Sequence, residues 1–186
     1  AEVSEEVPDA ADSNYPEVFK PTPNVSSGTI SPIGVVLHHS CGSYNGSVDW
    51  ILKTESQVSY HVIIDKDGSR TVFAEDNKRC WHAGKSEWDG LSNLNSHYLG
   101  FELLVPGKQT YDSFLKAIKQ PGTYTEAQFD AALSTCKWWM NQYNIPASNV
   151  VRHSDCSGDH VRGDRKGKVD PGSAFDWERF QAALVA

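Results

Sequence analysis

Two segments near the carboxyl terminus, VVRHSD at residues 150–155 and KVDPG at residues 168–172, decide how the rest of the chain is interpreted. They flank a loop that follows a long helical pattern, and they bring a histidine and an aspartate to the edge of the core. Far upstream, an apolar strand pattern ends on His38. His38, His153 and Asp170 together offer two imidazole nitrogens and one carboxylate, a ligand set that holds catalytic zinc and leaves a position open for water. The sequence therefore predicts a zinc centre on this loop.

The length and composition of the chain indicate one globular domain. With 186 residues, 39% of them hydrophobic and 22% charged, the chain can bury a core of ordinary size. No run of about 18 apolar residues occurs, so no membrane-spanning helix is expected. The net charge of −7 argues against a dedicated nucleic-acid-binding protein, because such proteins are usually basic. We expect a monomer with neither a nucleic-acid nor a membrane partner.

The first 28 residues differ from the remainder. They hold six acidic side chains against one lysine, a net charge of −5, and four prolines without a hydrophobic period. We interpret residues 1–28 as an acidic arm, extended or partly disordered, either a tolerated tail or one laid on the surface through Tyr15 and Phe19. The domain proper is expected over residues 29–186. The start of the chain lacks the basic and apolar regions of a signal peptide.

Hydrophobic periodicity after residue 28 predicts interleaved strands and helices. A short helix is expected to begin at Ser47 as its N-cap, another near residues 114–118, and a last one near Trp177. A capping box of Thr125 and Gln128 opens a longer amphipathic helix. Strands are expected at residues 33–38, 59–65, 70–73, 98–105 and 150–152, with a hairpin joining the second to the third. This alternation predicts a single α/β domain with a central mixed β-sheet flanked by helices.

The four cysteines show no CxxC pairing, so a structural zinc knuckle is not expected. They are Cys41, Cys80, Cys136 and Cys156. We expect all four to be reduced, with Cys41–Cys80 the most plausible bridge.

Two further charged residues are candidates for chemistry. Glu102 interrupts the apolar strand at residues 98–105, and burying an unpaired carboxylate is costly. Period-two alternation also allows Glu102 to face solvent, so this residue alone leaves both readings open. Lys168 precedes Asp170 by two positions in an extended segment and therefore projects to the same side. A cation in that place stabilises a developing oxyanion.

Six short motifs in order resemble the zinc-dependent N-acetylmuramoyl-L-alanine amidases of the type-2 class, whose relatives include T7-type lysozymes and peptidoglycan recognition proteins. The resemblance covers residues 33–180. The motifs are VLHHS at 36–40, VSYHVIIDKDG at 58–68, CWHAG at 80–84, LGFEL at 99–103, RHSD at 152–155 and KVDPGSAFDW at 168–177.

The resemblance implies a role for each matching residue. His38, His153 and Asp170 would bind Zn²⁺. Glu102 would handle the protons of the attacking water, and Lys168 would steady the oxyanion. Substrate contacts are implied at positions that line the groove or pack beneath it, namely Tyr60, His61, Trp81 and His82.

The chain departs from the compact members of this family between His153 and Asp170, where its segment is longer. That segment carries Cys156 and His160 near the expected metal, and we favour Asp170 over Cys156 as the third ligand. It also contains the integrin-type tripeptide Arg162-Gly163-Asp164, which we attribute to chance. His39 is expected to be a neighbour on the opposite face of its strand.

The resemblance implies a peptidoglycan hydrolase that cuts the amide between N-acetylmuramic acid and the L-alanine of the stem peptide. Its partner would be bacterial peptidoglycan. We expect a phage-type endolysin that is made in the host cytoplasm and acts on the cell wall. Two alternatives stay open: a recognition module that binds peptidoglycan without cutting it, and a cytosolic amidase that recycles anhydro-muropeptides.

Overall fold

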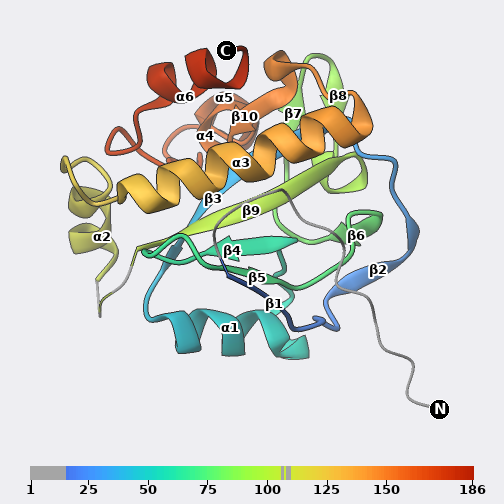
Figure 1. Ribbon diagram of the computed structural model, residues 1–186, viewed down its shortest axis with the longest axis horizontal. Helices are drawn as coiled ribbons and strands as arrows, with labels where there is room; N and C mark the ends of the chain where they lie inside the picture. Colours follow the sequence, from blue (N-terminus) through green and yellow to red (C-terminus); the bar gives the residue numbers. More distant parts are fainter. Residues whose placement is uncertain (1–15, 106, 108–109) are drawn as a thin grey trace.

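A six-stranded mixed sheet forms the centre of the molecule (Figure 1). The computed structural model describes residues 16–105, 107 and 110–186. Across the sheet the strands lie in the order β1 (Glu17–Phe19), β5 (Arg70–Val72), β4 (Val62–Ile64), β9 (Tyr98–Val105), β3 (Gly34–Cys41) and β10 (Val150–Arg152). Neighbouring strands are parallel except β4 and β5, which form the hairpin expected from the sequence. The predicted mixed sheet is confirmed.

Short elements complete the fold around this sheet. Two small antiparallel ribbons pair β2 (Val25–Thr29) with β6 (Lys78–Cys80) and β7 (Glu87–Trp88) with β8 (Leu91–Ser92). The helices are α1 (Tyr44–Leu52), α2 (Tyr111–Ala117), α3 (Glu126–Tyr143), α4 (His153–Cys156), α5 (Asp159–Arg162) and α6 (Trp177–Leu184), with 3₁₀ turns at Thr54–Ser56, Leu94–Ser96 and Ala147–Asn149.

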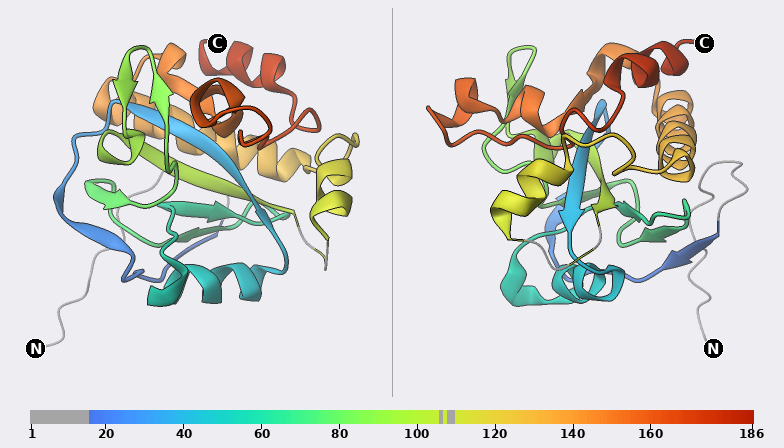
Figure 2. Two further views of the ribbon diagram at one scale, coloured as in Figure 1. Left: turned by 180° about the vertical axis from the view of Figure 1, so that it is seen from behind. Right: turned by 90° about the vertical axis from the view of Figure 1, so that its left-hand side faces the viewer.

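The two faces of the sheet are covered by different helices. Alternate residues of β9 point to opposite faces, so Leu103 joins the main core under α3 and α6 while Leu104 packs with Val48 and Ile51 of α1. Figure 2 shows α4 and α5 on the face away from α3, where Cys156 packs against β3 and β10. The face that α1 and α4 share is therefore only partly covered between them, and the functional side chains lie there.

The helix starts follow local capping chemistry. The capping box at α3 is confirmed, because the Thr125 hydroxyl accepts a hydrogen bond from the Gln128 N–H and the Gln128 side chain accepts one from the Thr125 N–H. The expected N-cap at Ser47 is wrong. Helix α1 begins at Tyr44, and the Ser43 hydroxyl caps it by accepting from the Gly46 N–H. The glycine inside the first turn weakens the helical pattern there, which hid the true start.

Residues 16–28 of the predicted acidic arm pack against the domain. Residues 1–15, including Tyr15, lie outside the described residues, but β1 pairs with β5 and the Phe19 side chain packs against the main core. Strand β2 pairs with β6, and its range crosses the expected boundary at residue 28. Asn24, just before β2, is fully buried, and its side-chain amide contacts the end of α1. The prolines and the very short strands leave no alternating hydrophobic pattern in residues 16–28. The sequence pattern therefore could not show that these residues pack against the domain.

The four cysteines are reduced, as expected. All four cysteines are free, with Cys41 exposed and Cys80 buried, so the suggested Cys41–Cys80 bridge does not form. Among the described residues, no helix has the length and apolar character needed to cross a membrane.

The buried Asn24 amide predicts that the segment before β2 stabilises the domain. Its Nδ2 lies 3.1 Å from the Ile51 carbonyl oxygen and 2.9 Å from that of Lys53, at the end of α1. Asn24→Ala should lower the free energy of unfolding in urea by about 1–3 kcal/mol, because the hydrogen bonds that the buried amide makes to main-chain carbonyls at and after the end of α1 are lost. The exposed Asn141→Ala is the control and should change it by less than about 0.5 kcal/mol. Equal stability of both variants would mean that the Asn24 amide does not stabilise the fold.

Candidate metal centre

The topology brings three potential ligands to one edge of the sheet. Strand β10 pairs with β3 so that Arg152 lies beside Leu37. The residues that follow these two in the sequence are His153 and His38. The loop after α5 then returns, and the Ser154 N–H donates to the Asp170 carbonyl 3.1 Å away. The parallel pairing of β10 with β3 and the returning loop thus place His38, His153 and Asp170 together.

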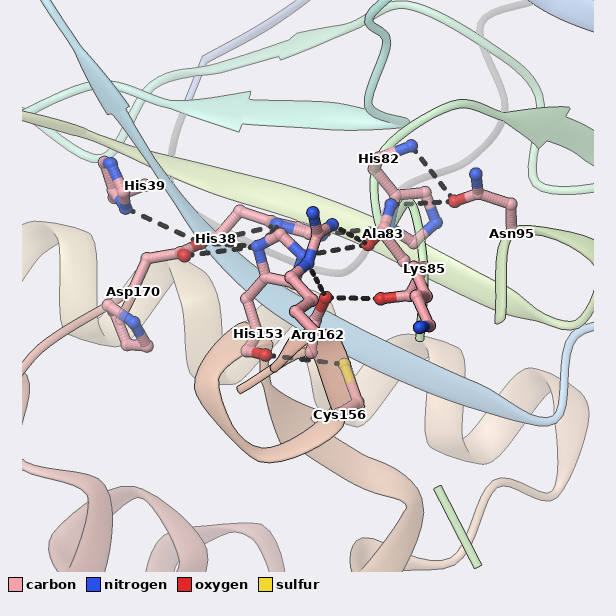
Figure 3. A network of polar contacts seen from close by, with 12 residues as sticks. His38, His39, His82, Ala83, Lys85, Asn95, His153, Cys156, Arg162 and Asp170 are labelled. Carbon is pink, nitrogen blue, oxygen red and sulfur yellow. Dashed lines mark hydrogen bonds and ion pairs between the residues drawn. The ribbon is translucent and has the colours of Figure 1, made fainter. Parts of the chain in front are cut away.

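The three ligand atoms are buried and face one another (Figure 3). His38 Nδ1 lies 3.1 Å from His153 Nδ1 and 3.5 Å from Asp170 Oδ2, and both Asp170 oxygens lie 3.1 Å from His153 Nδ1. The three residues are 1%, 5% and 3% exposed. For a tetrahedral ion bound at about 2.0–2.1 Å, ligand atoms are about 3.3 Å apart. The observed separations fit that value.

Hydrogen bonds behind the ligands fix the tautomer of His38. His82 Nε2 lies 3.0 Å from the Tyr98 carbonyl oxygen, which can only accept, so this nitrogen carries the His82 proton. His82 Nδ1 is then an acceptor, and His38 Nε2 donates to it at 2.9 Å. His38 Nδ1 is left with a lone pair that points at the other two ligands. Burial and the charge of His153 lower the pKa of His38 to about 3, so His38 is neutral at ordinary pH.

The same reasoning applies to His153. Its Nε2 donates to the Ala83 carbonyl oxygen at 3.0 Å, which leaves a lone pair on Nδ1. Burial alone would raise the pKa of Asp170, but a protonated His153, through its charge and a hydrogen bond from Nδ1, outweighs burial and holds that pKa well below its usual range. Neutral His153, with its lone pair on Nδ1, is the form that can bind a metal ion.

Two imidazole lone pairs and a carboxylate therefore converge within 3.5 Å. A proton on His153 Nδ1 can satisfy Asp170 but not His38 as well, whereas one cation satisfies all three. These residues fit a zinc ion.

Glu102 lies on the same sheet face as His38. The two residues are register partners on parallel strands, and Glu102 is 2% exposed, so the alternative of a solvent-facing carboxylate is wrong. Burial raises the pKa of Glu102 well above its usual value, although hydrogen bonds from Tyr60 and Ser40 act against that rise. Among the described residues, Glu102 Oε1 has no hydrogen-bond partner. It borders a groove of about 490 Å³ that also touches His39 and Tyr60.

Lys168 borders a second pocket beside the ligands. Its main-chain N–H donates to the Ser157 carbonyl at 2.8 Å, and its side chain is exposed. This pocket, of about 360 Å³, also touches His153 and Asp170. The lysine is therefore placed beside the metal ligands, as expected from its position two residues before Asp170.

The expected substrate-contact residues separate into two groups. Tyr60, Trp81 and His82 border the second pocket, and His82 also supports His38 from behind. His61 does not reach either pocket. It is fully buried, its Nε2 donates to the Lys78 carbonyl and its Nδ1 accepts from the Gly100 N–H, so both ring nitrogens bind the main chain. His61 therefore packs beneath the site, which is one of the two placements expected for these residues.

His39 and Cys156 lie near the ligands without joining them. The His39 ring stacks on Phe114 with centroids 4.2 Å apart, on the opposite strand face as expected, although its Nδ1 comes within 3.5 Å of Asp170 Oδ2. Cys156 is buried, and its Sγ donates to the His153 carbonyl. The metal-binding cluster found among the described residues contains Asp170 and not Cys156.

The sequence analysis missed Arg162. Its side chain borders the same pocket as Lys168, and it donates to the Ala83 carbonyl that also accepts from His153 (Figure 3). The tripeptide was dismissed as chance, but its first residue has a place at the site. The signal available in the sequence was an unusually long segment with several cations between two ligands.

The family model described as N-acetylmuramoyl-L-alanine amidase matches residues 29–173. Over 130 residues the chain is 33% identical to 1,6-anhydro-N-acetylmuramyl-L-alanine amidase AmpD of Salmonella typhimurium, covering 70% of this chain and 58% of that protein. Over 153 residues it is 27% identical to N-acetylmuramoyl-L-alanine amidase AmiD of Escherichia coli, covering 78% of this chain and 51% of that protein. The chain thus spans little more than half the length of these relatives.

Among solved structures, the fold is similar to that of AmiD from E. coli in complex with anhydro-N-acetylmuramic acid-L-Ala-D-gamma-Glu-L-Lys. The TM-score is 0.66 at 24% identity, covering 85% of this chain and 59% of that chain. At this identity the match shows the fold alone.

The hydrogen bond behind His38 predicts that His82 sets the affinity for zinc. His82→Leu fills much of the same buried space but removes the acceptor that fixes the His38 tautomer. The zinc dissociation constant should therefore rise roughly 10- to 100-fold. Competition with a chromophoric chelator measures it. The control is His160→Ala, an exposed histidine on α5, which should bind zinc like the unmodified chain. Undiminished affinity in His82→Leu would show that the tautomer is fixed in another way.

Proposed function

The chain belongs to the N-acetylmuramoyl-L-alanine amidase family, and we propose on that basis that it is a zinc-dependent amidase that acts on peptidoglycan-derived muropeptides. The bond cleaved is the amide between the lactyl group of N-acetylmuramic acid and the L-alanine of the stem peptide. The observation that carries the proposal is the convergence of His38, His153 and Asp170 beside the buried Glu102. We place the amidase unit from residue 29 to the end of the chain, with residues 16–28 packed against it.

The substrate that we propose carries 1,6-anhydro-N-acetylmuramic acid. AmpD is named for that group, and the AmiD structure holds a ligand that contains it. This support favours the recycling-type amidase, which the sequence analysis held as an alternative, over the phage-type endolysin that it preferred. In that ligand the glutamate is joined through its γ-carboxyl group, so its α-carboxylate is free.

His38, His153 and Asp170 are the residues that would hold the metal. When bound there, zinc supplies Lewis-acid chemistry, lowering the pKa of water to about 7 and polarising a carbonyl oxygen. The remaining steps belong to the side chains of this chain.

Glu102 moves the proton. Its burial raises the pKa of the carboxyl group, and an acid or base whose pKa lies nearer neutrality transfers protons efficiently in both directions. Oε1 has no partner among the described residues, so this oxygen is free to accept a proton from the attacking water. The same group then returns the proton to the nitrogen of the leaving L-alanine.

Lys168 stabilises the charge that develops on the scissile carbonyl. Its exposed side chain borders the pocket next to Asp170, and a cation there lowers the energy of an oxyanion more than that of the neutral carbonyl. Tyr60, between the two pockets, donates to Glu102 and helps to hold the carboxyl group in place.

The competing proposal is a recognition module that binds peptidoglycan without cutting it. Loss of a metal ligand would favour it. His38, His153 and Asp170 form one cluster, Lys168 borders the pocket that also touches His153 and Asp170, and Glu102 borders the neighbouring groove, which supports the enzyme.

The two roles predict different losses for two variants. Glu102→Gln should keep one zinc per chain and lose roughly 10²- to 10⁴-fold in kcat, because only proton transfer is removed. Asp170→Ala should lose both zinc and activity. Zinc is measured by atomic spectrometry and activity by new L-alanine amino termini. A chain that binds muropeptides but holds no zinc and releases no such termini would be a recognition module.

The substrate proposal predicts a preference. Soluble anhydro-muropeptides should be cleaved with a kcat/KM at least roughly tenfold above that for muropeptides with a reducing muramic acid, a difference of about 1.4 kcal/mol in the activation free energy. Intact sacculi are the third substrate in the comparison. Efficient lysis of sacculi with little cleavage of soluble anhydro-muropeptides would restore the endolysin reading.

A further inference from the structure

The long segment between His153 and Asp170 folds back on itself, and hydrogen bonds join its last residues to its first. The Gly167 N–H donates to Asp159 Oδ1 at 2.7 Å, and the Lys168 N–H donates to the Ser157 carbonyl at 2.8 Å. A side chain at Gly167 would collide with the Asp159 backbone, so the return of the chain requires glycine there. The segment is thus held against its own start, and it places Arg162 and Lys168 beside one pocket.

The guanidinium group of Arg162 is held in a fixed plane. Its Nε donates to Ser157 Oγ at 2.6 Å, and its Nη2 donates to the Ala83 carbonyl at 3.3 Å. Ser157 Oγ in turn donates to the Lys85 carbonyl. A Cβ atom at Gly84 would lie 2.6 Å from Nη2, so this glycine, with φ of +61°, allows the guanidinium to approach the backbone. Figure 3 shows Arg162 in this network beside His153.

Two of the three guanidinium nitrogens are therefore committed to the protein, and the third is not. Within the part of the chain that the structure describes, Arg162 Nη1 makes no hydrogen bond. The side chain is only partly exposed and borders the pocket of about 360 Å³ beside the metal ligands. Trp81, Asn95 and Gln57 also border this pocket, and Lys168 is its second cation.

A pocket with a fixed guanidinium and an ammonium group fits a carboxylate. The chain as a whole is acidic, with a net charge of −7, whereas this pocket is bordered by two cations. Arginine whose plane is already fixed binds a carboxylate with little further loss of side-chain entropy. In the substrate class proposed above, the nearest free carboxylate to the scissile bond lies on the residue after L-alanine, about 7 Å along an extended chain.

We propose that Arg162 determines substrate specificity by binding the free α-carboxylate of the γ-linked glutamate in the stem peptide. This inference rests on the proposed amidase function. It assigns the long segment to substrate selection, because α5 ends at Arg162 and the return of the loop holds that side chain beside the metal site.

The test compares two substrates that differ in one group. They are anhydro-N-acetylmuramoyl-L-Ala-D-γ-Glu-L-Lys and the same compound with the glutamate α-carboxylate converted to a carboxamide. The unmodified enzyme should cleave the carboxylate form with a kcat/KM roughly 10- to 100-fold higher, the range expected for a hydrogen bond to a charged group. Arg162→Ala should lose most of that preference by slowing the carboxylate substrate alone. Arg162→Lys should keep part of it.

The matched control is Lys166→Ala, which removes one exposed cation from the same segment and should keep the full preference. Zinc content is measured for every variant, since Arg162 shares the Ala83 carbonyl with His153. An unmodified enzyme without preference would overturn the inference, even if Arg162→Ala cannot be purified. An equal loss on both substrates in Arg162→Ala would also overturn it, because that is the result of a purely structural role. If the unmodified chain cleaves neither substrate, the amidase function itself fails.

Discussion

The site depends on two main-chain carbonyl groups that decide where the histidine protons lie. The Tyr98 carbonyl acts through His82, and the Ala83 carbonyl acts directly, and together they turn one lone pair of His38 and one of His153 toward Asp170. Because these residues are buried, water cannot donate hydrogen bonds to the two lone pairs and the carboxylate. The fold therefore holds an arrangement of acceptors that a single cation satisfies best, and the sheet that positions these carbonyls is part of the metal centre.

Residue type and order pointed to most of the site because three of its members lie on, or directly after, neighbouring strands of the sheet. His38 lies on β3, Glu102 is its register partner on β9, and His153 directly follows β10. Both β9 and β10 pair with β3 in parallel, so the three side chains are brought together by the sheet. The strand at residues 98–105 and the helix opened by Thr125 also carried clear periodic or capping signals. These two elements are long and regular, and for that reason their sequence patterns are clear.

The errors have a common physical origin. Short strands such as β1 and β2 are stabilised by pairing and by buried polar groups such as Asn24, neither of which leaves a hydrophobic period. Arg162 acquires its place only through the return of the loop onto α5. Each depends on contacts between residues far apart in sequence, which local patterns do not report.

X-ray absorption spectroscopy of the zinc-loaded chain tests the central claim most directly, because it reports the elements bound to the metal. The account predicts two imidazole nitrogens and oxygen ligands, all at about 2.0–2.2 Å, with no sulfur. The spectrum of Cys156→Ser should then be unchanged. A sulfur shell at about 2.3 Å, lost in that variant, would contradict the account by giving the third position to Cys156 in place of Asp170.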